Sequence, residues 1–213
     1  NKKCANHGTY KNWSSKTNLL RQADEFNFII VCPDGNRNSW YLDSPMKPES
    51  QYKTFFINEL VPWIKMNFRT NQMGITGLSM GGHGAFYLAI RHPELFDAVS
   101  GMSSGVDLTF STVKWELAKI LGLFELYPNR WYDHSVVNMV DLIQEGFMPI
   151  LIDCGYDDFF IGINRSFHHR LIDKNISHIY VEKPGGHNWD YWTNTLDEHL
   201  RFFENAFNGS NIN

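Results

Sequence analysis

Short apolar runs alternate with longer helical patterns along this chain, and this alternation restricts the possible folds more than any other feature of the sequence. The apolar runs lie at residues 28–32, 74–78, 98–101, 149–153 and 178–181. The helical patterns lie at about residues 52–68, 81–91, 160–174 and 191–207. Strands that alternate with helices usually form a parallel sheet covered by helices. The sequence therefore predicts an α/β fold with a mostly parallel central sheet and helices on both faces.

Residues 104–147 break the alternation. This stretch holds two helical patterns, at about 112–123 and 135–144, and Pro128 lies between them. An insertion of this size after a strand can cover a pocket. The length of 213 residues suits one domain with a sizeable core. We therefore expect a single domain over residues 1–213, with a cap-like helical insertion at about 104–147.

The charge balance argues against two classes of partner. The formal net charge is -4, so no basic excess exists to neutralise the phosphates of a nucleic acid. The sequence has no polybasic run and no apolar stretch of about 20 residues, so nothing in it indicates a membrane partner. Three cysteines give no disulfide framework, and no signal peptide is visible. The compartment, cytoplasmic or secreted, and the oligomeric state both stay open.

Residues 77–81 read Gly-Leu-Ser-Met-Gly, which is a G-x-S-x-G motif between an apolar run and a helix rich in Gly and Ala. In a nucleophile elbow, the sharp turn from strand to helix strains the serine backbone and requires small neighbours. Gly77, Gly81 and Gly82 meet that need. The turn also places Ser79 at the positive end of a helix, where a developing anion is stabilised. This context favours Ser79 as a nucleophile over an incidental serine in a glycine-rich turn.

A serine nucleophile needs a base, and in this fold an acid and then a histidine follow the serine along the chain. Of the nine histidines, only His187 lies on a Gly-rich loop after a late strand. His83 is near the motif, but we expect its side chain to face away. The acid candidates are Asp157 and Asp158, with Asp153 as a third. Spacing alone does not choose among them.

Three blocks of the sequence resemble the esterase D family of α/β-hydrolases, and the similarity extends over most of the chain from Trp13 onward. The blocks are residues 77–85, residues 153–160 with Asn164 and Phe167, and residues 184–189. The family includes tributyrin, feruloyl and acetyl-xylan esterases, S-formylglutathione hydrolases and mycolyltransferases. The second and third blocks look most like the tributyrin-esterase branch.

The resemblance assigns roles to individual residues. It implies that Asp158 is the acid, because the family places its acid three residues after the glycine that is Gly155 here. The S-formylglutathione hydrolase pattern has Gln where this chain has Cys154, so that activity ranks low. The resemblance also implies that Trp40 and Tyr41, in the loop after the first apolar run, face the substrate; their alternative role is packing. Trp189 is a further expected substrate-binding residue.

The start of the chain departs from the family pattern. Family members have an apolar strand that runs into a His-Gly-x-x-Gly loop, and that loop supplies one of two oxyanion-hole amides. Here the strand is absent. Residues 6–13 could be a remnant of the loop, or His7-Gly8 is a chance dipeptide and the hole is built differently. We expect the amide of Met80 and one near Gly8 or Thr9 to form the oxyanion hole. We also expect the natural domain to carry further N-terminal strands.

The sequence as a whole predicts a serine carboxylesterase that acts through an acyl-enzyme intermediate. Ser79 would attack the ester carbonyl, His187 would carry the proton, and Asp158 would orient His187. The expected substrate is a small-molecule or carbohydrate-linked ester, and no metal or cofactor is needed. Two alternatives are an acyltransferase with the same triad and a non-catalytic binding module on a hydrolase scaffold.

Overall fold

The computed structural model describes residues 9–209. Its centre is a parallel sheet of four strands in the order β1-β2-β3-β4. The strands are β1 (Gly74–Ile75), β2 (Ala98–Met102), β3 (Ile150–Gly155) and β4 (Ile179–Lys183). The α-helices are α1 (Lys11–Lys16), α2 (Leu19–Glu25), α3 (Tyr52–Phe55), α4 (Val61–Asn67), α5 (Met80–Arg91), α6 (Leu117–Leu121), α7 (Pro128–His134), α8 (Ile161–Asp173) and α9 (Trp189–Phe207). Because the strands are parallel, the loops at their carboxyl ends gather at one edge of the sheet.

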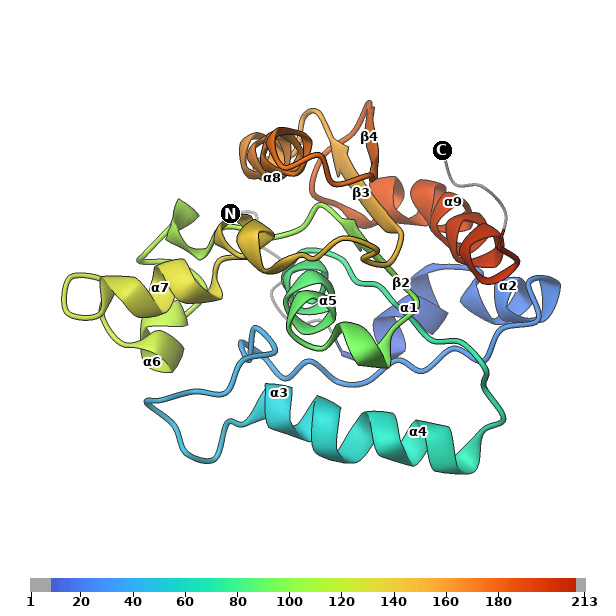
Figure 1. Cartoon of the computed structure of the whole chain (residues 1–213), viewed down its shortest axis with the longest axis horizontal. Helices are drawn as coiled ribbons and strands as arrows, with labels where there is room; N and C mark the ends of the chain where they lie inside the picture. Colours follow the sequence, from blue (N-terminus) through green and yellow to red (C-terminus); the bar gives the residue numbers. More distant parts are fainter. Residues whose placement is uncertain (1–8, 210–213) are drawn as a thin grey trace.

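Helices cover both faces of the sheet (Figure 1). On one face, α4, α5 and α8 share an apolar core with Val99 and Ile152. On the other face, α9 packs against Ala98 and Leu151, and α2 lies beside it. Neighbouring strand residues belong to opposite cores because side chains alternate across a strand. The predicted α/β fold, with a mostly parallel sheet and helices on both faces, is confirmed.

The helical pattern at residues 52–68 is one continuous helical stretch. It consists of α3, a π-helical segment over Phe56–Leu60, and α4. Pro62 lies at the start of α4, directly after the π-helical segment, and a proline inside a helix has no N–H to donate, so the regular hydrogen-bond pattern is interrupted there. The inward side of this stretch buries Phe56 and Val61 against α5.

The strand expected at Phe28–Cys32 is absent, and that prediction is wrong. The segment alternates as a strand would: Phe28, Ile30 and Cys32 pack towards α9, whereas Ile29 is 55% exposed. A strand also needs a hydrogen-bonded partner. Within residues 9–209, the edge strand β1 is two residues long and pairs with β2 only, so no strand of the sheet is hydrogen-bonded to residues 28–32.

The two helices expected in the insertion are also misplaced. The pattern at 112–123 forms only the short α6, and the pattern at 135–144 forms two 3₁₀ turns, Val136–Asn138 and Val140–Leu142. The longer helix is α7, which begins at Pro128. A proline fits the first position of a helix, since the N–H there needs no partner. Pro128 therefore does not separate two helices but starts the helix that buries Trp131.

Candidate active site

Ser79 lies at the sharp turn between the end of the β1 segment and α5. Its backbone has φ 54° and ψ -115°, which is unusual for a residue with a side chain. The turn is held by hydrogen bonds from the Ser79 amide to the Met102 carbonyl, 2.9 Å, and from the Gly105 amide to the Ser79 carbonyl, 3.1 Å. Strain at a side chain that reaches into a cavity is typical of a functional residue.

Of the three glycines next to Ser79 in the sequence, two have no room for a side chain. A Cβ added at Gly77 would lie 2.4 Å from the backbone of Gly81, and one at Gly82 would lie 2.2 Å from Ser104 Oγ. A Cβ at Gly81 would meet nothing closer than the Tyr41 hydroxyl at 3.8 Å. The expectation that all three positions must be small therefore holds for Gly77 and Gly82 but not for Gly81.

The loops that follow β3 and β4 are joined by backbone hydrogen bonds. The Tyr156 amide donates to the Lys183 carbonyl and the Asp157 amide donates to the Gly185 carbonyl, both at 3.0 Å. Gly155 faces the Gly185 carbonyl so closely that an added Cβ would lie 2.2 Å from it. This close contact brings the aspartates of the first loop next to the histidine of the second.

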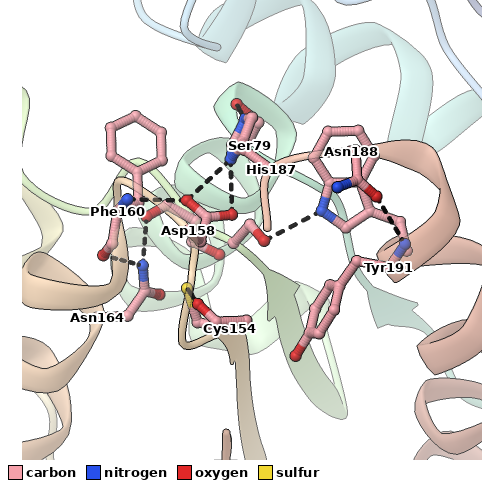
Figure 2. A network of polar contacts seen from close by, with 12 residues as sticks. Ser79, Cys154, Asp158, Phe160, Asn164, His187, Asn188 and Tyr191 are labelled. Carbon is pink, nitrogen blue, oxygen red and sulfur yellow. Dashed lines mark hydrogen bonds and ion pairs between the residues drawn. The ribbon is translucent and has the colours of Figure 1, made fainter. Parts of the chain in front are cut away.

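The structure brings Ser79, His187 and Asp158 together in one hydrogen-bonded row (Figure 2). His187 Nε2 is 2.9 Å from Ser79 Oγ, and His187 Nδ1 is 2.8 Å from Asp158 Oδ2. The Asp158 side chain is fully buried and the His187 side chain is 16% exposed. Asp158 Oδ1 also accepts a hydrogen bond from the Phe160 amide at 2.8 Å. The carboxylate is therefore fixed in position by the backbone of its own loop.

The other two acid candidates do not face His187. Asp157 is exposed. Asp153 is buried on the α9 side of β3, where its carboxylate accepts a hydrogen bond from the Tyr191 hydroxyl and lies 3.3 Å from His199 Nε2. Asp153 therefore ties α9 to the sheet.

Aromatic rings enclose the imidazole of His187. The ring centroids of Phe159 and Phe160 lie 4.3 and 5.3 Å from that of His187, and the Trp192 centroid lies 4.9 Å away at an interplanar angle of 88°. Trp192 is itself held by a hydrogen bond from its indole nitrogen to Ser103 Oγ, 3.1 Å. Packing on several sides keeps the imidazole in the orientation that its two hydrogen bonds require.

His83 lies close to the elbow in sequence but has a different environment. Its ring is buried, with Nδ1 3.0 Å from the Trp40 carbonyl and Nε2 2.9 Å from the His134 carbonyl. Burial lowers the pKa of His83 to about 4, so the ring is neutral near pH 7. His83 links the loop around Trp40 to α7, and it faces away from Ser79 as expected.

The expected substrate-binding residues differ in exposure. Trp40 is 3% exposed and packs edge-on against His83, so its ring is part of the core. Tyr41 is partly buried over α5, and burial raises its pKa to about 12, which keeps the hydroxyl protonated. Trp189 is partly exposed at the start of α9 and packs against Trp13 and Trp192. Together with Ser79 and His187, these three residues line one cavity of about 1770 Å³.

The expected oxyanion donors are only partly described. Met80 is the first residue of α5, so its amide is one of those that an α-helix leaves without an internal partner. Thr9 is exposed, lines the same cavity, and accepts a hydrogen bond from the Asn12 amide at the start of α1. Gly8 lies outside the described residues.

Within residues 9–209, no group of three or more His, Cys, Asp or Glu side chains is arranged to hold a metal ion. In the same part of the chain, no helix is both long enough and apolar enough to cross a bilayer.

Three aromatic residues of the site, two of them in the insertion, were not predicted from the sequence. Phe110 and Trp115 line the cavity of Ser79, and Phe159, which follows Asp158 directly, contacts His187. One usable signal was present, because two adjacent aromatic residues follow the candidate acid in the sequence. The contribution of Phe110 and Trp115 depends on the path of an irregular loop, which no periodic pattern encodes.

The parallel sheet, the elbow and the hydrogen-bonded Ser-His-Asp row define the class of this protein, the α/β-hydrolases. Residues 5–203 match the family described as "Esterase: Putative esterase". The chain belongs to this esterase family, as the resemblance in its sequence implied, and it is a carboxylic ester hydrolase.

Individual relatives agree with the family assignment. The acetyl esterase of Caldicellulosiruptor saccharolyticus is 27% identical over 94% of this chain and 78% of that protein. A ferulic acid esterase structure superposes with a TM-score of 0.78 and 26% identity, over 93% of this chain and 81% of that one. The S-formylglutathione hydrolase of Agrobacterium tumefaciens gives a TM-score of 0.76 and 25% identity, over 93% and 80%.

Proposed function

We propose that this protein hydrolyses carboxylic esters through an acyl-enzyme on Ser79. His187 takes the proton of the Ser79 hydroxyl as Oγ attacks the ester carbonyl, and it then donates that proton to the leaving alkoxide. Water then attacks the acyl-enzyme, again with His187 as base, and releases the acid. The observation that carries this proposal is the unbroken row of hydrogen bonds from Ser79 through His187 to the buried Asp158.

Asp158 has an orienting role in this proposal. Its carboxylate accepts from His187 Nδ1, which leaves Nε2 free to accept the serine proton and stabilises the imidazolium that forms. The Met80 amide, at the start of α5, is one donor to the oxyanion. An amide near Gly8 or Thr9 is proposed as the second. No metal or organic cofactor takes part in these steps.

The substrate is proposed to be a small-molecule or carbohydrate-linked ester. The acetyl esterase and ferulic acid esterase relatives favour this range. The residue 104–147 insertion is proposed to act as a cap within a single domain, because its Phe110 and Trp115 line the cavity that contains Ser79.

A nucleophile substitution tests the proposal. We expect Ser79→Ala to lower kcat for a chromogenic ester by roughly 10⁶-fold, as removal of the nucleophile does in other triad enzymes. Its unfolding transition should match that of the wild type within about 1 kcal/mol, because one hydroxyl is lost. Ser166→Ala is the control, since this serine lies on the exposed side of α8 and outside the row. Near-normal turnover by folded Ser79→Ala would refute the assignment.

A further inference from the structure

Three aromatic rings lie together, with nearly parallel planes, on one side of the candidate active site. They belong to Phe110 and Trp115, from the insertion, and to Phe159, which follows Asp158. The centroids of Phe110 and Trp115 lie 6.3 Å apart. The Phe159 centroid lies 6.5 Å from that of Phe110 and 6.3 Å from that of Trp115, and the interplanar angles of the three pairs are 20–28°. Phe110 is 42% exposed and Phe159 is 50% exposed. We call these three residues the aromatic wall.

The aromatic wall is firmly supported. Behind it lies Phe160, which is 1% exposed and contacts Phe110 and Trp115 at centroid distances of 5.3 and 5.4 Å. Trp115 and Glu116 have left-handed backbones, φ 56° and 55°, and Glu116 accepts a hydrogen bond from the side chain of Asn38 at 2.7 Å. Residues keep such backbones only where surrounding contacts enforce them. The rings therefore present a flat face that is formed before any ligand arrives.

The aromatic wall lies beside His187, and this position decides which part of the ester it can contact. Phe159 packs on His187 with centroids 4.3 Å apart, and all three wall residues line the cavity of Ser79. In the proposed reaction His187 hands its proton to the leaving oxygen, so the alcohol part of the ester departs beside the imidazole. The group next to the wall is therefore the alcohol part.

We propose that the aromatic wall is a subsite for the alcohol part of the ester, and that it selects alcohols carrying a ring with a flat face. An aromatic ring and the CH face of a sugar share this chemistry, because both can stack on exposed aromatic side chains. This inference rests on the proposed function, since it uses the role given there to His187.

Esters of one acid with different alcohols test the inference. Ethyl, benzyl and methyl-xyloside acetates are compared with wild type, Phe110→Ala, Trp115→Ala and the double variant. We expect kcat/KM for a ring-bearing acetate to fall roughly two- to tenfold per lost ring, the range typical of aromatic pairs. Activity on ethyl acetate should change less than about twofold. A fall in kcat/KM confined to benzyl acetate indicates that the subsite takes an aromatic alcohol. A fall confined to the xyloside acetate indicates that it takes a sugar.

Two controls separate the possible failures. Leu126→Ala removes another exposed apolar side chain of the insertion, 67% exposed and outside the cavity, and should change none of the three rates. Ethyl phenylacetate carries its ring on the acyl side. The subsite would be overturned if the wall variants lost as much kcat/KM on ethyl acetate as on the ring-bearing acetates, or if they lost it only on ethyl phenylacetate. If instead Ser79→Ala hydrolyses ethyl acetate as fast as wild type, the proposed function itself fails.

Discussion

At the scale of single residues, two neighbouring aspartates offer a sharp comparison. Asp158 accepts from His187 Nδ1 in a fully buried position, whereas Asp157 is exposed. We predict that Asp158→Asn lowers kcat by roughly 10⁴-fold, because an amide favours the wrong histidine tautomer. Asp157→Asn should change it less than about threefold. Steady-state kinetics on both variants decide the matter, and a reversed ranking would make Asp157 the acid.

His83 gives a prediction about stability and pH. Its pKa of about 4 in the folded protein lies below the value of about 6.5 in an unfolded chain. Between these pH values the unfolded state binds more protons, so the free energy of unfolding falls as the pH falls. The contribution of His83 is complete above about pH 6.5, and about 3 kcal/mol of it is lost by pH 4, at about 1.4 kcal/mol per pKa unit.

Urea unfolding at several pH values measures this effect. The wild type should lose more stability than His83→Gln between pH 7 and pH 4, although the variant is less stable at pH 7. Identical pH dependence in wild type and His83→Gln would show that His83 is not held neutral by burial.

At the scale of elements, the elbow depends on how closely the segment before Ser79 approaches α5. Gly77 has no room for a Cβ, because the nearest backbone atoms of Gly81 would lie 2.4 Å away, whereas Gly81 has room. We predict that Gly77→Ala lowers the free energy of unfolding by more than about 2 kcal/mol, as overpacking of a tight contact does. Gly81→Ala should lower it by less than about 1 kcal/mol. Thermal unfolding of both variants checks this, and equal effects would contradict the described approach.

Helices and strands with a clear periodic pattern could be predicted from the sequence. Segments whose conformation depends on contacts with distant parts of the chain could not. The helix over residues 81–91 and the strand over 149–153 were placed within one or two residues of α5 and β3. In contrast, Phe28–Cys32 has the right pattern for a strand but lacks a hydrogen-bonding partner. The turns at Val136–Asn138 and Val140–Leu142 show the same limitation, since contacts with distant parts of the chain decided their form.

At the scale of the whole molecule, one edge of the sheet collects parts that are far apart in the sequence. Ser79 and His187 are 108 residues apart and lie 2.9 Å from each other. The order of the strands predicted this meeting, because the loops after parallel strands share an edge. The choice of Asp158 over Asp157 came from the family resemblance, since the orientation of two adjacent side chains depends on loop geometry that spacing does not reveal.

Buried polar contacts fix α9, and with it the loop of His187, to the sheet. Asp153 binds the Tyr191 hydroxyl and lies 3.3 Å from His199, whose other ring nitrogen is 2.8 Å from Ser100 Oγ. Buried polar groups specify one arrangement strongly when all are paired. These contacts lie on the α9 face of the sheet. They fix the position of His187, the proposed base, relative to Ser79, which follows the β1 segment of the sheet.

The central claim is that Ser79 forms a covalent intermediate with the help of His187. Intact-mass measurement with a fluorophosphonate tests it most directly, because this reagent reacts with a serine that a base has activated. The account predicts one adduct per chain, located on Ser79 by peptide mapping, absent in Ser79→Ala, and formed at least roughly 10³-fold more slowly in His187→Gln. An adduct on another residue, or equally fast labelling of Ser79 without His187, would contradict the account.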